Sequence, residues 1–310
     1  MAIKKITAFA PATVANFVCG YDILGFAIEG IGDEVSVSFN QKFENTFALL
    51  SNHSELQQLP PEKNVAFEMV KQVQEAIGRT DGIHIELNKK MPLNSGLGSS
   101  SASAVAALVA ANALYDNPLS TDQLLPLAME GERLACGTAH ADNVAPSLLG
   151  GIVLVKGYQP LEVVSIPVPK HWYCCVVHAH VDVPTRLARK ILKTTIPLKE
   201  AVVQFGNIAG LIAGIYSGND QLVSNSMQDV LIEPHRSLLI PYFQEMKKLA
   251  LGENAIGFGI SGSGPSVFAL CKTEQQATQI ADAIEQLLIS AQIGRDVFVS
   301  RISTQGAHIL

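Results

Sequence analysis

The stretch that decides the fold of this chain is short and rich in glycine and serine: Pro92-Leu93-Asn94-Ser95-Gly96-Leu97-Gly98-Ser99-Ser100-Ser101-Ala102-Ser103-Ala104. Before it, residues 83–87 alternate apolar and polar side chains, which predicts a half-buried strand. After it, residues 102–114 are rich in alanine and leucine and lack proline and glycine, which predicts a helix. A strand, a flexible loop and a helix start together predict a site where backbone N–H groups bind an anion such as phosphate.

The loop matches neither of the two commonest phosphate-binding patterns. A P-loop requires a lysine after its last glycine, whereas Gly98 is followed directly by Ser99. The dinucleotide-binding pattern G-x-G-x-x-G fails at Ser101. A serine-glycine linker is the alternative, but such a linker seldom lies between a strand and an alanine-rich helix. We therefore predict a phosphate-binding loop of another type.

Composition restricts the class of protein. The chain has 310 residues, of which 48% are hydrophobic and 16% charged, so we expect one large or two medium folded domains. The net charge of −6 and the lack of a basic run argue against a nucleic-acid partner. No apolar run reaches the roughly 18 residues of a membrane span, and the five cysteines form no C-x-x-C pair. These features predict a cytoplasmic protein with reduced thiols and no membrane partner.

Polar residues in apolar surroundings are the first candidates for ligand contacts. Residues 3–9 predict a strand that runs into an apolar loop over residues 10–25, which contains Asn16 and Asp22. A buried carboxylate needs a partner, so Asp22 either caps a turn or contacts a ligand. Asn64 precedes a helix with apolar residues at every fourth position, so a purely capping role is the alternative to a ligand contact.

Two glutamates follow in a helix that Ser120 is expected to cap. Glu130 comes three residues after Leu127, on what we expect to be the apolar side, whereas Glu132 is expected to be a solvated surface charge. A buried glutamate requires a cation, and a magnesium ion is one candidate.

A polar cluster comes next, where His140, Asp142 and Asn143 occur within four residues between apolar segments. A single histidine in such a place is more often structural. Because Asp142 and Asn143 stand beside it, we favour a functional site.

The second half of the chain predicts an antiparallel α+β unit. Residues 157–170 contain three prolines and are expected to form the crossover to it. The expected strands are 172–179, 255–260, 266–271 and 295–302, and the expected helices are 198–216, 219–230, 241–250 and 274–288. Between two of these strands, residues 257–266 contain four glycines and three serines, more than a hairpin turn requires. We therefore favour a backbone wall against a ligand.

Three motifs in a fixed order carry a resemblance to a known family: the loop 10–25, the loop 92–104 and the loop 257–266. Together they resemble the GHMP kinases, which phosphorylate small metabolites. Within that family the chain is most similar to the homoserine kinases. The residues that carry this likeness are Pro11 to Asn16 with Gly20-Tyr21-Asp22, His140 to Pro146 with Gly150-Gly151, and Glu233 to Arg236.

The resemblance implies a two-domain α+β fold. A domain like ribosomal protein S5 domain 2 is expected over residues 1–165, and a ferredoxin-like domain over residues 166–310. The implied reaction transfers the γ-phosphoryl group of ATP to the side-chain hydroxyl of L-homoserine, and its product feeds threonine biosynthesis. The family resemblance also suggests a homodimer.

The resemblance also implies roles for residues of the motifs. The loop Pro92 to Ala102 would hold the triphosphate, Ser99 and Glu130 would bind Mg²⁺, and Asn64 would lie by the base. Asn143 and His140 would stand at the catalytic centre. The amino-acid site would be lined by Asn16, Asp22, His140, Asn143, Arg186 and Arg236, with Gly262 in the loop that closes it.

One departure from the wider family bears on the mechanism. Mevalonate-type relatives place an aspartate and a lysine where the attacking hydroxyl loses its proton, whereas this chain has Asn143 and no lysine within residues 10–25. Asp142 should point elsewhere if its segment is extended. We therefore expect in-line transfer without a strong base. The alternatives are another GHMP kinase, of mevalonate type, and a sensor that binds ATP without transfer, although a sensor need not keep Ser99 and Glu130.

Overall fold

Two β-sheets organise the chain, of which the computed structural model describes residues 4–42, 44–51, 57–137 and 139–310. The first sheet has seven strands with the order β11-β1-β2-β4-β3, and β5 joins it by pairing with β2 and β6. Its strands are β1 (Lys5–Ala15), β2 (Leu24–Phe39), β3 (Thr46–Leu49), β4 (Ile83–Asn88), β5 (Ile152–Tyr158), β6 (Leu161–Ile166) and β11 (His308–Ile309).

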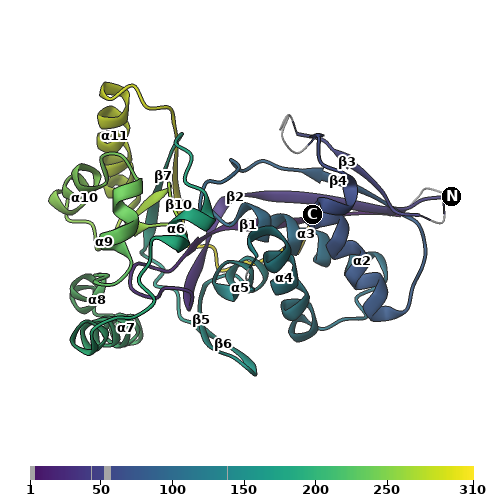
Figure 1. Ribbon diagram of the computed structural model, residues 1–310, viewed down its shortest axis with the longest axis horizontal. Coiled ribbons are helices and arrows are strands. Elements are labelled where there is room, and N and C mark those ends of the chain that lie inside the picture. Colours follow the sequence, from purple (N-terminus) through teal and green to yellow (C-terminus); the bar gives the residue numbers. More distant parts are fainter. Residues whose placement is uncertain (1–3, 43, 52–56, 138) are drawn as a thin grey trace.

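Helices of the first half pack on one side of this sheet (Figure 1). They are α2 (Val65–Ile77), α3 (Ser99–Leu114), α4 (Thr121–Cys136) and α5 (Ala141–Leu149), and a short 3-10 turn (Pro61–Lys63) precedes α2. Helix α3 is buried along most of its length, because its many alanines allow it to pack closely against β1 and β2. The phosphate-loop helix is therefore the centre of this half.

The second sheet has four antiparallel strands in the order β10-β7-β9-β8. They are β7 (Tyr173–Ala179), β8 (Gly257–Ile260), β9 (Val267–Cys271) and β10 (Arg295–Arg301). Helices α10 (Phe243–Gly252) and α11 (Glu274–Ser290) contribute apolar side chains to the core of this half. The remaining helices are α6 (Thr185–Lys190), α7 (Leu198–Ser217), α8 (Asp220–Ser226) and α9 (Glu233–Arg236), followed by a 3-10 turn (Ser237–Leu239).

The predicted α+β class with two units is confirmed, with three differences in detail. β1 continues to Ala15 and β2 begins at Leu24, so half of the expected loop 10–25 is strand. β6 lies within the segment that the prolines led us to expect as a plain crossover. β11 returns from the second half and pairs with β1, placing Ile309 opposite Ala8. β11 therefore belongs to the first sheet, although its residues follow the expected division at residues 165 and 166.

Aromatic packing joins the two halves. Phe17 and Phe26 come from the first sheet's strands and the loop between them, and Phe268 comes from β9. The ring centroids lie 4.9 Å apart for Phe17 and Phe26 and 5.6 Å apart for Phe26 and Phe268. All three side chains are fully buried, so the apolar core is continuous between the two halves.

The thiols described by the structure are inert in their present surroundings. Cys19, Cys174, Cys175 and Cys271 are free and buried, and burial raises the pKa of each thiol. The side chain of Cys136 lies outside the described part.

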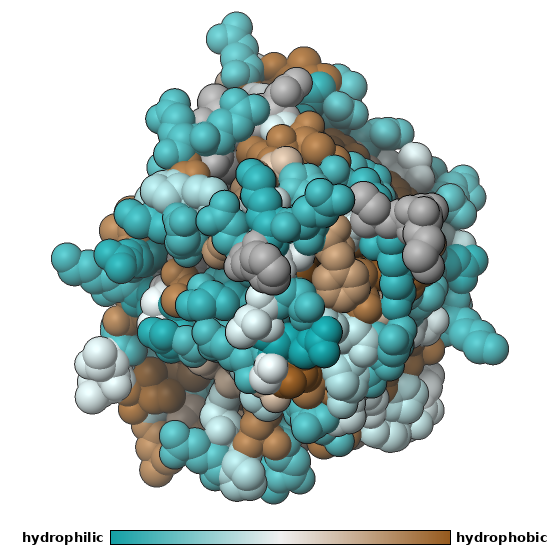
Figure 2. Space-filling model, turned by 90° about the vertical axis from the view of Figure 1, so that its right-hand side faces the viewer, coloured by the Kyte–Doolittle hydropathy of each residue, from teal (hydrophilic) through white to brown (hydrophobic). Residues whose placement is uncertain are grey.

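The surface is polar at one end and apolar along one helix at the other. Figure 2 views the end formed by the first half, which carries mainly hydrophilic side chains with scattered hydrophobic ones. Helix α7, at the other end, exposes Leu198, Val202 and Phe205. By length and composition α7 is the one described helix that could cross a membrane, and 28% of its most apolar window is buried; a single such helix is weak evidence of a membrane span.

Candidate functional site

The glycine-serine loop ends in a set of backbone donors at the start of a helix. Helix α3 begins at Ser99, three residues earlier than expected, and its first backbone hydrogen bond runs from the Ala102 N–H to the Gly98 carbonyl. The N–H groups of Ser99, Ser100 and Ser101 therefore precede the helical ladder. Because they lie at the positive end of the helix dipole, they are suited to bind an anion, as the sequence predicts.

Two glycines allow neighbouring segments to approach the loop. Gly98 has φ +68°, and a Cβ there would lie 2.2 Å from Thr13 Oγ1. Gly96 has φ +78°, and a Cβ there would lie 2.5 Å from the carbonyl oxygen of Ser261. Neither position accepts a side chain, both because of the left-handed backbone and because of these contacts. The second glycine-rich loop thus packs directly on the first.

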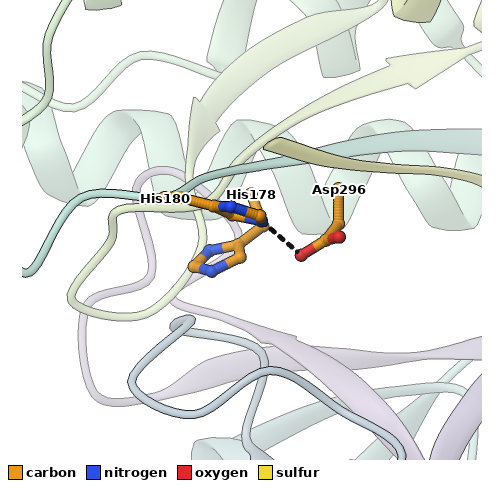
Figure 3. A group of neighbouring side chains, drawn as sticks. All are labelled: His178, His180 and Asp296. Atoms are coloured by element: carbon orange, nitrogen blue, oxygen red, sulfur yellow. Dashed lines mark hydrogen bonds and ion pairs between the residues drawn. The ribbon is translucent and has the colours of Figure 1, made fainter. Parts of the chain in front are cut away.

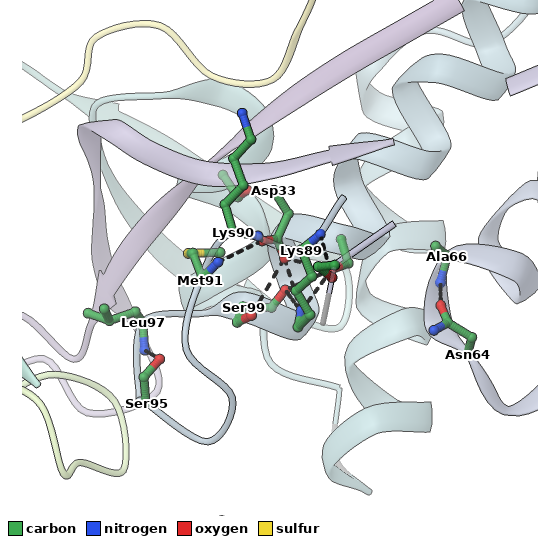
Figure 4. A network of polar contacts seen from close by, with 12 residues as sticks. Asp33, Asn64, Ala66, Lys89, Lys90, Met91, Ser95, Leu97 and Ser99 are labelled. Carbon is green, nitrogen blue, oxygen red and sulfur yellow. Dashed lines mark hydrogen bonds and ion pairs between the residues drawn. The ribbon is translucent and has the colours of Figure 1, made fainter. Parts of the chain in front are cut away.

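A buried polar network contacts the first turn of α3 (Figure 4). The Lys89 ammonium lies 3.0 Å from Asp33 Oδ2, and it donates to the Ser99 carbonyl at 3.1 Å and to Ser103 Oγ at 2.9 Å. Asp33 is fully buried and also accepts from the backbone N–H groups of Lys90 and Met91. The sequence analysis missed Asp33 and Lys89, because each looks like an ordinary strand-end charge until the fold brings the two together.

A cavity of about 580 Å³ opens on one side of the loop. Leu93, Asn94 and Ser100 line it, and so does Asn64. The Asn64 side chain accepts a hydrogen bond from the Ala66 N–H at 3.0 Å, which confirms the predicted N-cap. The same residue therefore caps α2 and borders the cavity, so the capping role does not exclude a ligand contact.

A second cavity of about 400 Å³ lies on the other side of the loop, between the two halves of the chain. It shares Asn94, Ser99 and Ser100 with the first cavity, so the loop stands between two spaces. Every residue expected to line the amino-acid site borders it: Asn16, Asp22, His140, Asn143, Arg186, Arg236 and Gly262.

The cavity wall contains an ion pair that the sequence analysis missed. Arg189, in α6, donates to Asp22 Oδ2 at 3.0 Å and to Asp22 Oδ1 at 3.3 Å. Asn16 orients this aspartate, because its Oδ1 accepts from the Asp22 N–H at 3.1 Å. His140 Nδ1 lies 3.5 Å from Asp22 Oδ2 but is buried without a hydrogen-bond partner. Burial lowers the pKa of His140, with Asp22 acting in the opposite direction, so the ring is neutral at neutral pH.

The two arginines expected in the site differ in their surroundings. Arg236 is only 3% exposed, and it donates to the carbonyl groups of Gly262 and Ala188 while it stacks 4.9 Å above the Tyr21 ring. Burial lowers its pKa, although an arginine stays charged at neutral pH. Arg186 is exposed and makes no hydrogen bond within the described part of the chain. Arg236 therefore holds the loop at Gly262 in place, whereas Arg186 keeps its donors available.

The expected burial of the two glutamates in α4 is wrong for both. The Glu130 side chain is 37% exposed and pairs with Arg133 on the surface. Glu132 is 8% exposed, borders the inter-domain cavity and accepts from Ser101 Oγ at 2.7 Å. The buried stripe of α4 passes through Leu125 and Ala128, and Glu132 lies seven and four residues after them. The sequence analysis took Leu127 as the buried reference position and therefore predicted burial for Glu130 instead of Glu132.

The cluster around Asn143 is helical, so the condition under which Asp142 was expected to point elsewhere, an extended segment, is not met. Asn143 lies in the first turn of α5, and its Oδ1 accepts from Thr13 Oγ1 at 2.7 Å. Asp142 borders the same cavity instead of pointing elsewhere. Burial raises the pKa of Asp142 to about 8, and Asp22 and Glu132 add to this effect. Asp142 is therefore mostly protonated at neutral pH.

Comparison with known proteins agrees with this architecture. Family models described as GHMP kinases N terminal domain and GHMP kinases C terminal match residues 64–151 and 207–289. A homoserine kinase of Chlorobium phaeobacteroides is 42% identical over 99% of this chain and 100% of its own length. The crystal structure of homoserine kinase from Cytophaga hutchinsonii is 48% identical, with a TM-score of 0.95 over 99% of this chain and 97% of that one. Mevalonate kinase of Methanococcus jannaschii, at 16% identity and a TM-score of 0.70 over 97% of this chain and 98% of that one, shares the fold.

Proposed function

The chain belongs to the GHMP kinase family, and on that premise we propose that it transfers the γ-phosphoryl group of ATP to the side-chain hydroxyl of L-homoserine. One observation carries the proposal: a single phosphate loop separates two cavities, one of which is lined by the amino-acid-site residues expected from the sequence. Two homoserine kinases, related over nearly the full length of this chain, support the choice of acceptor.

The charges of the inter-domain cavity suit a zwitterionic acceptor. Homoserine carries an ammonium and a carboxylate on the same carbon. We assign the ammonium to Asp22 and the carboxylate to Arg189 and Arg186, so that the substrate extends the ion pair of Asp22 and Arg189 in the cavity wall. In this assignment Arg236 positions the Gly262 loop through its hydrogen bond to that carbonyl.

The nucleotide would occupy the larger cavity, with its base near Asn64 and its triphosphate on the N–H groups at the start of α3. The donor set for Mg²⁺ fits on the acceptor side, where the Ser99 hydroxyl and the Glu132 carboxylate border one cavity. We therefore propose Glu132 as the metal ligand in place of Glu130. A bound Mg²⁺ would neutralise phosphate charge during transfer.

We propose that alignment and charge stabilisation account for most of the catalysis. Asn143 and its partner Thr13 lie against Gly98, so they can hold the attacking hydroxyl beside the phosphate loop, and the neutral His140 borders the same space. Backbone N–H donors then stabilise the charge of the transferred group. Phosphoryl transfer through a loose transition state requires little from a base.

Asp142 provides a second candidate mechanism, because it borders the cavity and its raised pKa would suit a general base. The Asp142→Asn variant separates the two mechanisms at pH 7, where the amide resembles the protonated acid. Transfer without a base predicts a kcat within about tenfold of wild type, and a general base predicts a loss of about 10²- to 10⁴-fold.

A coupled assay with purified protein, Mg²⁺, ATP and homoserine tests the proposed function. Turnover with homoserine, well above that with mevalonate or galactose, is the expected result. Faster turnover with mevalonate would favour the mevalonate-type alternative. ATP binding measured by calorimetry without any phosphorylated product would favour a sensor, and it would contradict the proposal.

Two further expectations remain proposals. The cytoplasm is proposed as the location, which agrees with the free, buried thiols of the described chain. A homodimer is proposed from the family resemblance, and light scattering of the purified protein tests it.

A further inference from the structure

Two histidines and one aspartate meet at the edge of the second sheet, away from both cavities (Figure 3). His178 lies near the end of β7 and His180 follows this strand. Asp296 lies in β10, in direct register with His178. Because strand pairing fixes the backbone of both strands, the cluster is held by the sheet rather than by a loose loop.

The three side chains can offer ligand atoms at short range. One nitrogen from each histidine and one oxygen from Asp296 all lie within 4.8 Å of one another. His180 Nε2 already lies 2.9 Å from Asp296 Oδ2. Ligands of a tetrahedral zinc ion stand about 3.3 Å apart, so small side-chain rotations would suffice. The side chains of His180 and Asp296 are 50% and 39% exposed, which leaves them room to rotate.

The third ligand, His178, is fixed. It is buried, and its Nδ1 lies 3.3 Å from Ser266 Oγ. Strand pairing with β10 and this contact hold the imidazole where its ring faces Asp296 across the sheet. The ion pair of His180 and Asp296 does not by itself require a buried third histidine beside it.

We propose that His178, His180 and Asp296 bind a divalent transition-metal ion, with water completing the coordination. Two imidazoles and one carboxylate suit Zn²⁺ best among common ions, whereas Mg²⁺ prefers oxygen ligands. This ion is therefore distinct from the Mg²⁺ of the proposed reaction.

The position of the cluster gives the ion a structural consequence. The ligands join β7 to β10, and β10 is an edge strand of its sheet. Ser266, which contacts His178, also donates its backbone N–H to the Ser95 carbonyl in the phosphate loop at 3.2 Å. A bound ion would thus fix an edge strand and, through His178, the segment that packs on the phosphate loop.

The test uses tag-free, full-length protein treated with EDTA, dialysed and then saturated with Mg²⁺. We expect Zn²⁺ titrated by calorimetry to bind with a stoichiometry of one, and Co²⁺ to give the visible absorption of a four-coordinate site. The His180→Ala and Asp296→Asn variants should each bind Zn²⁺ at least about tenfold more weakly, because even indirect support of a metal is worth that much.

The matched control is His171→Ala. His171 is also half-exposed and also pairs with an aspartate, Asp220 at 3.0 Å, but it belongs to no three-ligand group in the described chain. Its loss should leave Zn²⁺ affinity unchanged. Equal weakening by His171→Ala and His180→Ala, or no saturable Zn²⁺ binding by the wild type, would overturn the proposal. Unchanged circular dichroism of the surface variants excludes misfolding as the cause of any loss.

Discussion

At the scale of single residues, two glutamates in one helix have opposite environments. Glu130 points to solvent beside Arg133, whereas Glu132 faces the cavity beside Ser101. The two carboxylates stand two positions apart, so a helical periodicity counted from the wrong leucine exchanges them. Since both residues have the same side chain, they form a matched pair for experiment.

We predict that Glu132→Gln lowers kcat/KM for Mg·ATP by at least about tenfold, because the variant loses a charged metal ligand. Glu130→Gln should stay within about twofold of wild type, because its carboxylate is exposed and paired only on the surface. Steady-state kinetics at several Mg²⁺ concentrations measures both. A larger loss in Glu130→Gln than in Glu132→Gln would restore the sequence-based assignment.

The ion pair of Asp22 and Arg189 leads to a prediction on acceptor binding. Arg189→Gln should raise the KM for homoserine by roughly ten- to a hundredfold and change the KM for ATP little, since a charged hydrogen bond contributes about 1.5–3 kcal/mol. Lys190→Gln, one residue away in α6 and exposed, is the control. An effect on ATP alone would contradict the carboxylate assignment.

The raised pKa of Asp142 predicts a pH dependence of stability. Its pKa rises from 3.8 to about 8 on folding, so the folded state favours the protonated acid. The contribution of Asp142 to the free energy of unfolding is therefore fully present below pH 4, and it is lost as the pH rises from about 4 through 8. The Asp142→Asn variant lacks this loss. The free energy of unfolding of the variant minus that of the wild type should therefore grow from pH 5 to 8. Urea titrations in EDTA measure it, and a constant difference would contradict the burial argument.

At the scale of elements, the phosphate loop was predictable because all its signals are local. Residues 92–104 and the flanking strand and helix follow from composition and periodicity within a short window. Helix α5 was not predictable from the sequence. Its nine residues include Pro146 and its first turn is polar, so its sequence resembles that of a loop. Packing against β1 and β2, rather than propensity, accounts for that helix.

The close packing of the loop predicts that Gly98→Ala abolishes most activity. The added Cβ would stand 2.2 Å from Thr13 Oγ1 and 2.8 Å from Asn143 Oδ1, and misalignment by about 1 Å costs about a hundredfold in rate. Gly78→Ala is the control, because Gly78 has nearly the same φ of +67° but no atom within 4 Å of a Cβ. Equal losses of kcat would mean that backbone strain, and not the contact with Asn143, is responsible.

At the scale of the whole molecule, the two halves are connected by buried aromatic side chains and by the pairing of β11 with β1. Phe268 packs with Phe17 and Phe26, and residues after β10 return to the first sheet. The sequence could not predict this return, because β11 has two residues and its partner lies about 300 positions away. Long-range pairing of so short a strand leaves no periodic signal.

The tail gives a prediction for stability. Gly306→Ala would place a Cβ 2.2 Å from the Leu148 carbonyl oxygen, and such overpacking costs roughly 1–3 kcal/mol. Tm should fall by several degrees in a single transition, because one apolar cluster contains buried residues of both halves. Gly252→Ala, with no atom within 4 Å of its Cβ, should change Tm little. Calorimetry compares the two, and two separate transitions would contradict the coupling.

The return of β11 also bears on how the protein is made. The edge of β1 that β11 covers emerges from the ribosome about 300 residues before its partner, a delay of roughly 15 to 60 s at ordinary rates of translation. During that interval the first sheet has an open edge, able to pair with other strands. Completion of the first half therefore waits for the second, and a chain stalled late in synthesis would expose β1 to chaperones or to aggregation.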